Sequence, residues 1–206
     1  MRAIIIGTGP SLTSEAIEQI NASELHKFGC NNVYQVIPDL TAHLACNIEW
    51  WGHYGKDISQ YSFDKWTWDE ATAEKWRINY VSGAWCDGLS TDPKVIHYGH
   101  SSGYQLINLA LHYGVKEFVL IGYDMKYPKG YDGHRKQAGG NRHFFGEYPK
   151  ELQHWTKFNI GENGELNGLL ECYRTINPED YGIRIINCSP DTALDFFEKG
   201  RLEDYL

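Results

Sequence analysis

Short apolar runs and segments of helical periodicity alternate along the chain. Strands are expected at Ala3–Ile6, Phe28–Val33, Thr41–Cys46, Ile78–Val81, Lys94–Tyr98, Phe118–Ile121 and Ile183–Ile186. Helices are expected at Ser14–Ile20, Asp69–Arg77 and Glu165–Ile176, and another is expected to start at Ser101 or Ser102 and to end at Gly114. Strands that alternate with helices form a mainly parallel sheet flanked by helices. The pattern therefore predicts an α/β fold, and 206 residues suit a single domain with a sizeable core.

The stretch from His100 to Asp124 is the clearest unit of this pattern. The apolar face of its helix consists of Leu106, Leu109, Ala110 and Tyr113. Ser101 or Ser102 is expected to cap this helix, because a short hydroxyl side chain accepts from the first free N–H groups. The strand that follows ends just before Tyr123 and Asp124. In Rossmann-like open sheets, ligands bind at helix N-termini and beyond the carboxyl ends of strands, so both ends of the unit are candidate ligand contacts.

A glycine turn, Gly7-Thr8-Gly9-Pro10-Ser11-Leu12, connects the first strand to the first helix. Glycines let the backbone approach a ligand closely, and helix N–H groups face its anionic part, so the order predicts a phosphate- or nucleotide-binding loop. The turn lacks the third glycine of the dinucleotide fingerprint and the Gly-Lys-Ser/Thr of a Walker A loop. A plain tight turn explains the same residues.

Asparagines follow two further strands, with Asn31 and Asn32 after the second and Asn47 after the third. Their amides can bond a base or a ribose, and they are also common turn formers. Glu49-Trp50-Trp51 is expected to start a helix or lid element, and residues 52–68 are expected to form a loop. The pattern leaves open whether the aromatic stretch 50–76 is lid, interface or core.

The segment from Lys126 to Lys150 is polar, rich in glycine and poor in aliphatic residues. Such a segment cannot build a core, and its position after Asp124 predicts a lid over the site. Its basic residues are Lys126, Lys129, Arg135, Lys136 and Arg142. They suit a phosphate or carboxylate ligand, although a solvated surface loop has the same composition.

Composition narrows the classes of protein that fit. A formal net charge of −8 argues against a nucleic-acid-coating surface. The chain has five cysteines, an odd number, and they form no CxxC motif, so we expect reduced, buried thiols in a cytoplasmic protein.

The chain opens on a strand-like run without a signal peptide, and its apolar runs are far shorter than the ~20 residues of a membrane span. His97 and His100 lack completing ligands nearby in the sequence, so we expect no metal site.

Several segments together resemble two related groups of proteins. These segments are AIIIGTGPSL, GCNNVY, the strand ending Ala45-Cys46-Asn47, SSGYQLINLALHYGVKEFVLIGYDM and IINCSPDTAL. They resemble the small CMP-sialic-acid-dependent bacterial sialyltransferases and the motility-accessory-factor-like family, which includes a pterin diphosphokinase branch. Short phage-encoded proteins share the elements ACxxxWW, GxxSGYQxxNLAxxxG, GxDM and HxFG-(D/E)-x-P, so the resemblance also implies a phage origin in host cytoplasm. It covers nearly the whole chain.

The resemblance to the sialyltransferases implies a cytidine-nucleotide site. Together with the glycine turn and the asparagines, this resemblance identifies the candidate nucleotide-binding residues. They are Gly7, Thr8, Gly9, Pro10, Ser11, Asn31, Asn32, Asn47, Ser101, Ser102, Gly103 and Asp124. The chain departs from the family at Thr8, where the sialyltransferases have asparagine.

The resemblance also implies a catalytic group. The base histidine of the family falls on Glu147, and the histidine before it is kept as His143, so either residue is a candidate general base. The tyrosine expected after Asp124 falls on Lys126, with Tyr127 beside it and Tyr131 as a second candidate. These three residues are candidates to assist departure of the leaving phosphate.

Three functions follow from these observations. The first is metal-independent glycosyl transfer from a nucleotide sugar, CMP-linked by resemblance, to an unknown acceptor, without a cofactor. The second is a pterin-type diphosphokinase using ATP and magnesium on carboxylates such as Asp124 and Asp132. The third is a non-catalytic phage accessory protein that keeps the fold, and a homo-oligomer fits each of the three. A dinucleotide oxidoreductase is disfavoured by the missing glycine.

Overall fold

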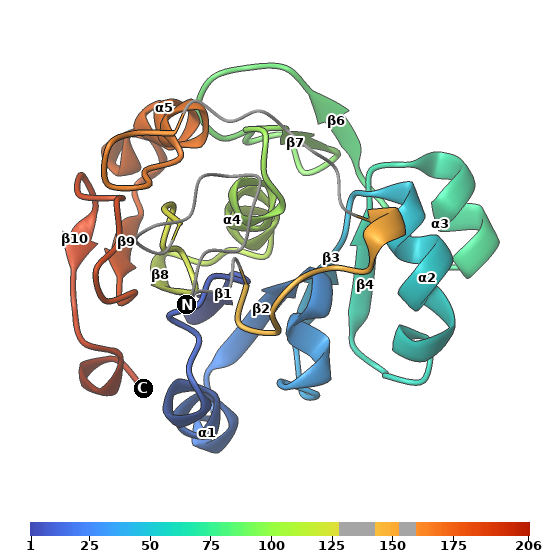
Figure 1. Cartoon of the computed structure of the whole chain (residues 1–206). Coiled ribbons are helices and arrows are strands. Elements are labelled where there is room, and N and C mark those ends of the chain that lie inside the picture. Colours follow the sequence, from blue (N-terminus) through green and yellow to red (C-terminus); the bar gives the residue numbers. More distant parts are fainter. Residues whose placement is uncertain (128–142, 153–159) are drawn as a thin grey trace.

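The computed structural model of the protein describes residues 1–127, 143–152 and 160–206. Its main sheet has eight strands, and all of their pairings are parallel. Across the sheet the strands are β10 (Glu198–Lys199), β9 (Arg184–Asn187), β8 (Glu117–Ile121), β1 (Arg2–Ile6), β2 (His26–Cys30), β3 (Ala42–Leu44), β4 (Asp64–Thr67) and β5 (Asn79–Tyr80). Figure 1 shows this sheet running from β10 at the left to β4 at the right. The predicted α/β fold with a mainly parallel sheet is confirmed.

The order of the strands reverses between β1 and β8. From β1 the chain builds the sheet outward through β2, β3, β4 and β5, and β8 then pairs with the other side of β1. Parallel sheets open a crevice at such a point, because the connections on its two sides leave in opposite directions. The glycine turn and the segment from Gly122 to Lys126 both lie at this crevice, at the carboxyl ends of β1 and β8.

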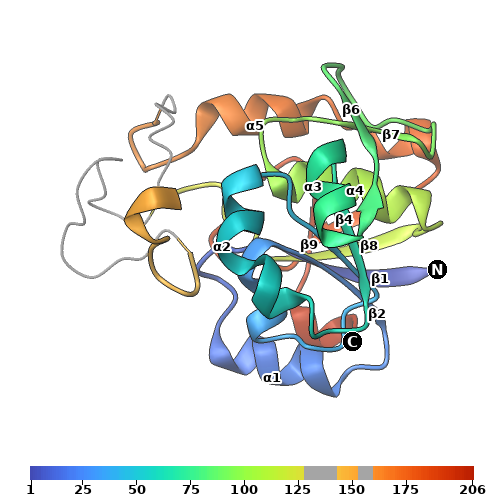
Figure 2. The same cartoon turned by 90° about the vertical axis from the view of Figure 1, so that its right-hand side faces the viewer.

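Helices cover both faces of the sheet. On one face lie α4 (Ser102–His112) and α5 (Asn167–Arg174), and on the other lie α1 (Ser14–Ala22), the 3-10 helix η1 (Asn31–Gln35) and α2 (Ile48–Ile58). Figure 2 shows α4 and α5 above the sheet and α1 below it. The remaining elements are α3 (Glu70–Trp76), a two-stranded parallel ribbon of β6 (Ser82–Ala84) and β7 (Val95–His97), and the 3-10 helices η2 (Lys150–Leu152), η3 (Pro178–Tyr181) and η4 (Leu202–Asp204).

Burial on both faces explains why the central strands read as continuous apolar runs. Along β1, Ala3 and Ile5 pack against the cluster beneath α4, whereas Ile4 and Ile6 pack against α1 and α2. All four side chains are fully buried. Side chains alternate between the faces of a strand, so a sheet with two covered faces needs apolar residues at every position.

Three local predictions were wrong. Residues 31–33 form part of η1 rather than the end of a strand. Residues 52–58 continue α2, and residues 64–67 form β4, so 52–68 is not a loop. The strand β6 lies between the expected strands Ile78–Val81 and Lys94–Tyr98, where no strand was expected. Glycine and aromatic residues interrupt the periodicity in these segments, and packing against the sheet overrides local propensity.

The aromatic stretch 50–76 belongs mainly to the core. Trp50 and Trp51 are buried, and Trp66, Trp68 and Trp76 pack against the two core clusters.

All five cysteines are free. Cys30, Cys46 and Cys188 are buried as expected, whereas Cys86 is exposed and Cys172 is half-buried. Within the described ranges, no helix combines the length and apolar character needed to cross a membrane.

Candidate functional site

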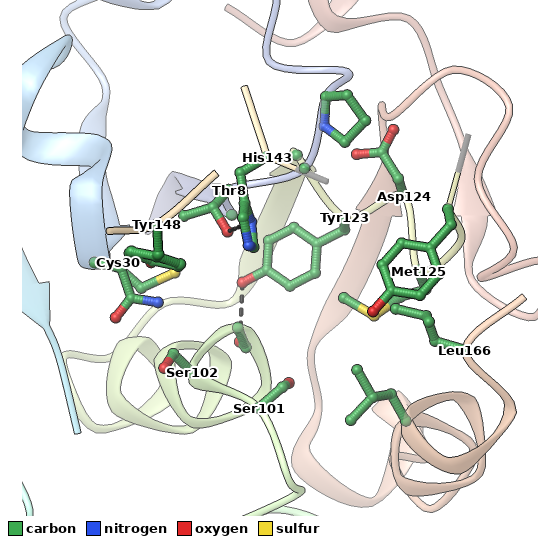
Figure 3. Close-up of a pocket in the computed structure, with 18 of the residues that line it drawn as sticks. Thr8, Cys30, Ser101, Ser102, Tyr123, Asp124, Met125, His143, Tyr148 and Leu166 are labelled. Carbon is green, nitrogen blue, oxygen red and sulfur yellow. Dashed lines mark hydrogen bonds between the residues drawn. The ribbon is translucent and has the colours of Figure 1, made fainter. Parts of the chain in front are cut away.

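A cavity of about 330 Å³ opens at the carboxyl ends of β1 and β8. It receives side chains from the glycine turn, from the start of α4 and from the segment after β8 (Figure 3). The predicted site residues that line it are Gly7, Thr8, Gly9, Pro10, Asn31, Asn47, Ser101, Ser102, Gly103, Asp124, Lys126, Tyr127 and His143. Ser11, Asn32 and Glu147 are not among its lining residues. Tyr131, Asp132 and the basic residues at 129, 135, 136 and 142 lie outside the described part of the chain.

Two glycines bring the turn into close contact with the segment after β8. The N–H groups of Gly7 and Gly9 donate to the carbonyls of Ile121 and Gly122 at 2.8 and 2.9 Å. A Cβ atom at Gly7 would stand 2.5 Å from the Gly122 oxygen, and one at Gly9 would stand 2.0 Å from Asp124 Oδ2. Neither position has room for a side chain, so these glycines are required by packing at the site.

Asp124 fastens the glycine turn to the end of β8. Its carboxylate accepts from the Ser11 hydroxyl at 2.8 Å and from the Ser11 backbone N–H at 3.1 Å. Burial raises the pKa of Asp124, and the hydrogen bonds from Ser11 oppose that shift. Ser11 therefore contributes to the site through Asp124 rather than as part of the cavity wall.

The N-terminus of α4 forms the opposite wall. Ser101 is the cap, since its hydroxyl accepts from the Tyr104 N–H at 3.2 Å. Ser102 and Gly103 are the first two helical residues, so their N–H groups have no acceptor within the helix. They are oriented for an anion, and the helix dipole favours negative charge there. Behind them, the Tyr123 hydroxyl donates to the Gly103 carbonyl at 2.9 Å (Figure 3).

His143 lies over the glycine turn. Its Nδ1 is 3.1 Å from the Thr8 hydroxyl oxygen, and the N–H of Phe144 donates to the Thr8 carbonyl at 3.0 Å. The imidazole stacks on Phe145 with ring centroids 5.0 Å apart. These contacts fix the ring at the cavity, which is the placement that a general base needs. The predicted lid is described only at Lys126, at Tyr127 and from His143 onward.

The asparagines have mostly structural contacts. Asn47 Oδ1 caps α2 by accepting from the Trp50 N–H at 3.0 Å, and Asn32 Oδ1 accepts from Trp50 Nε1 at 2.8 Å. Asn31 adopts a left-handed conformation with φ of 50°, and its carbonyl oxygen lies 2.7 Å from His43 Nε2. Asn31 and Asn47 line the cavity nevertheless, whereas Asn32 is buried behind it.

Lys126 places a cation at the rim of the cavity. Its ammonium group lies 2.5 Å from a carboxylate oxygen of Asp191, which is itself almost fully exposed. Thr192, the next residue, donates its hydroxyl hydrogen to the Tyr123 carbonyl at 2.7 Å. The loop after β9 therefore holds the segment that carries Asp124 and Lys126.

Sequence reasoning did not identify the apolar half of the site. This half consists of Trp50, Met125, Tyr148, Leu152, Leu166 and Leu169. Leu166 and Leu169 were recognised only as part of an amphipathic helix, because the same spacing serves a core face and a ligand pocket. An apolar wall opposite a polar one is the usual composition of a small-molecule site. In the described ranges, no group of three or more histidine, cysteine, aspartate or glutamate side chains is placed to hold a metal ion.

Comparisons with known proteins give one informative result. Neither protein-family models nor curated sequences match the chain. Among solved structures, the MAf glycosyltransferase from Magnetospirillum magneticum AMB-1 superposes with a TM-score of 0.60 at 13% sequence identity. The match covers 98% of this chain but only 34% of that protein, so the chain spans about a third of its length. This α/β fold is therefore one that a glycosyltransferase also uses.

Proposed function

We propose that the cavity binds a nucleotide sugar and that the protein transfers its glycosyl group to an acceptor hydroxyl. One observation carries the proposal: the glycine turn and the free N–H groups at the start of α4 face one cavity at the strand-order reversal. That arrangement suits a phosphate between two sets of backbone donors. The likeness to a glycosyltransferase fold supports the reaction class, and the sequence resemblance favours a CMP-linked donor.

Each wall has a role in this proposal. The donor phosphate lies against Ser102 and Gly103, and the nucleoside extends toward Asn31 and Asn47 at the ends of β2 and β3. The apolar wall around Trp50 excludes water from the reacting centre, which strengthens every electrostatic contact there. Ser11 acts through Asp124 as a positioning residue.

The reaction is a direct displacement at the anomeric carbon. The acceptor oxygen forms the new bond to that carbon, the bond from carbon to the phosphate oxygen breaks, and the acceptor proton passes to His143. Because Nδ1 of His143 lies beside the Thr8 hydroxyl, Nε2 is the ring nitrogen that takes this proton in the proposed step. His143 is favoured over Glu147 because it lines the cavity. Lys126 and Tyr127 stabilise the charge that develops on the departing phosphate, and Tyr131 remains a candidate for the same task.

Calorimetry with CMP, CDP, UDP, GDP and ATP, each with and without magnesium, tests the proposal. Binding of a nucleotide without magnesium is expected, with CMP or CDP the tightest. Magnesium-dependent binding of ATP would favour the diphosphokinase instead. Failure of all of these nucleotides to bind at millimolar concentration would rule out a nucleotide site and favour the non-catalytic accessory protein.

A variant of the base separates binding from chemistry. His143→Gln should keep nucleotide affinity and lower the release of nucleotide from the sugar donor by a factor of about 10² to 10⁴. Glu147→Gln is the matched control and should keep its rate. A fall with Glu147→Gln and none with His143→Gln would reverse the assignment of the base.

A further inference from the structure

A second cavity, also of about 330 Å³, lies beside the first. Residues 101–103 line the first cavity, whereas His100 and Tyr104, on either side of them in the sequence, line the second. Tyr173 links the two, since its hydroxyl is 3.0 Å from the Ser101 hydroxyl and its ring packs on Tyr104 at 5.4 Å. The two cavities thus have the start of α4 in common.

The second cavity lies at the end of a smaller parallel sheet, in the same kind of position as the first. Trp85 follows directly after β6, and Tyr98 and His100 follow β7, its parallel partner. The cavity therefore lies at the carboxyl end of a parallel strand pair, where ligands bind in open parallel sheets. The β6–β7 ribbon lies on the same side of the main sheet as α4 (Figure 2).

Trp85 gives this cavity an aromatic surface. The residue is 68% exposed, the most of any large apolar residue among those described. Its ring is held by Tyr98 at 4.6 Å and by His100 at 4.8 Å between centroids. A single exposed tryptophan is ordinary on a surface, but this one lines a cavity and has neighbours on two sides. A fixed and accessible indole face offers contact area at little cost in conformational entropy.

The polar lining disfavours an anion and suits a ligand with several hydroxyl groups. Asp87, His100 and Thr175 line the cavity beside Trp85, and together they can accept and donate hydrogen bonds. Lysine and arginine are absent from the described residues that line it, in contrast to a phosphate site. A quaternary ammonium ligand would use the indole and the Asp87 carboxylate but not the hydroxyl and imidazole groups. A pyranose uses both, because it has one apolar C–H face and a rim of hydroxyls.

We propose that this second cavity binds a pyranose ring of a glycan, stacked on Trp85. Its use as a subsite for the non-reacting part of the acceptor rests on the proposed function, whereas sugar binding itself does not.

Titration with methyl glycosides of glucose, galactose, mannose and N-acetylglucosamine, followed by the indole N–H signals in NMR, tests the proposal. The Trp85 signal is identified by its loss in Trp85→Phe. At least one glycoside should shift that signal, and Trp85→Ala should weaken binding by about tenfold or more. Tyr80→Ala, which removes another exposed ring, is the control and should bind as before.

The same variants are titrated with CMP, and circular dichroism confirms that they are folded. Loss of glycoside binding with CMP affinity kept, in Trp85→Ala, supports a second and separate site. A Trp85 signal that no glycoside moves, or that choline moves in place of the sugars, overturns the proposal even if CMP binds. Sugar binding without CMP binding would instead contradict only the proposed function.

Discussion

His43 is a buried histidine that the fold keeps neutral. Its ring stacks on Trp50 with centroids 5.3 Å apart, and its Nε2 bonds the carbonyl of Asn31 at the cavity. Burial lowers its pKa to about 3, and the bond to Asn31 opposes that shift. Because the pKa in the folded state is below that of the unfolded chain, protonation favours unfolding.

Stability should therefore fall as the pH falls from about 6.5 toward 3, and it should be unaffected by His43 above that range. The slope for one proton is about 1.4 kcal/mol per pH unit. His43→Gln can still donate to Asn31 and should reduce that slope in urea unfolding measured from pH 7 to pH 4. His26→Gln, at an exposed histidine, is the control. Equal slopes in wild type and His43→Gln would show that His43 is not responsible.

Asp124 and Ser11 form a pair whose energetic coupling can be measured. Three donor–acceptor contacts join them in a mostly buried place, so removing either partner leaves the other unsatisfied. Asp124→Ala, Ser11→Ala and the double variant should give a coupling free energy of ~1–3 kcal/mol in urea unfolding. Additive losses would mean that the carboxylate is not held by Ser11 in solution.

At the scale of single elements, the first turn of α4 allows the contribution of an N-cap to stability to be measured. Ser101→Ala should lower the free energy of unfolding by at least ~1 kcal/mol, or about 2–4 °C in Tm, because it removes the cap and the hydrogen bond to the Tyr173 hydroxyl. Ser102→Ala changes the same atoms one position later, where the side chain is not the cap, and should cost less. Thermal unfolding followed by circular dichroism measures both. A larger loss at Ser102 would contradict the capping geometry.

Helix α2 contains a glycine whose replacement should be stabilising. A Cβ atom at Gly52 would meet no atom within 4 Å, and the residue is exposed. Gly52→Ala should raise the free energy of unfolding by ~0.5–1 kcal/mol through lower backbone entropy in the unfolded chain. Gly55→Ala is the contrast, since its Cβ would lie 2.5 Å from the ring of Trp76. Unfolding of Gly52→Ala at lower urea concentration than wild type would refute this expectation.

The sequence was most informative where one physical signal dominated. The run Phe118–Ile121 and the glycine after it identified β8, because only a strand buried on both faces needs such a run. The glycine turn and the start of α4 were located at the site by the rule for carboxyl ends of parallel strands. Long-range packing could not be predicted from the sequence. The residues next to Trp50, Tyr148 and Leu169 in the sequence do not indicate whether these side chains line a cavity or belong to the core. Asn32 illustrates the converse, since its role depends on Trp50, 18 residues away.

At the scale of the whole molecule, the site joins parts of the chain that are distant in sequence. A ligand that bridges the glycine turn and α4 stabilises only the folded state, so binding and unfolding are linked. CMP at about 100 times its Kd should add ~2.7 kcal/mol to the free energy of unfolding. Thermal shift of wild type and of Gly9→Ala, whose Cβ would collide with Asp124, measures this gain. An equal shift in both proteins would place the ligand elsewhere.

The pairing of β1 with β8 has a consequence for biosynthesis. Ser11 and Asp124 are 113 residues apart, so the first strand leaves the ribosome long before its second neighbour exists. At about 5–20 residues per second, that delay amounts to roughly 6–23 s. During this interval one edge of an apolar strand has no partner, which invites wrong pairing with other nascent chains. Yield of correctly folded protein should therefore depend on translation rate and on chaperones that shield this edge.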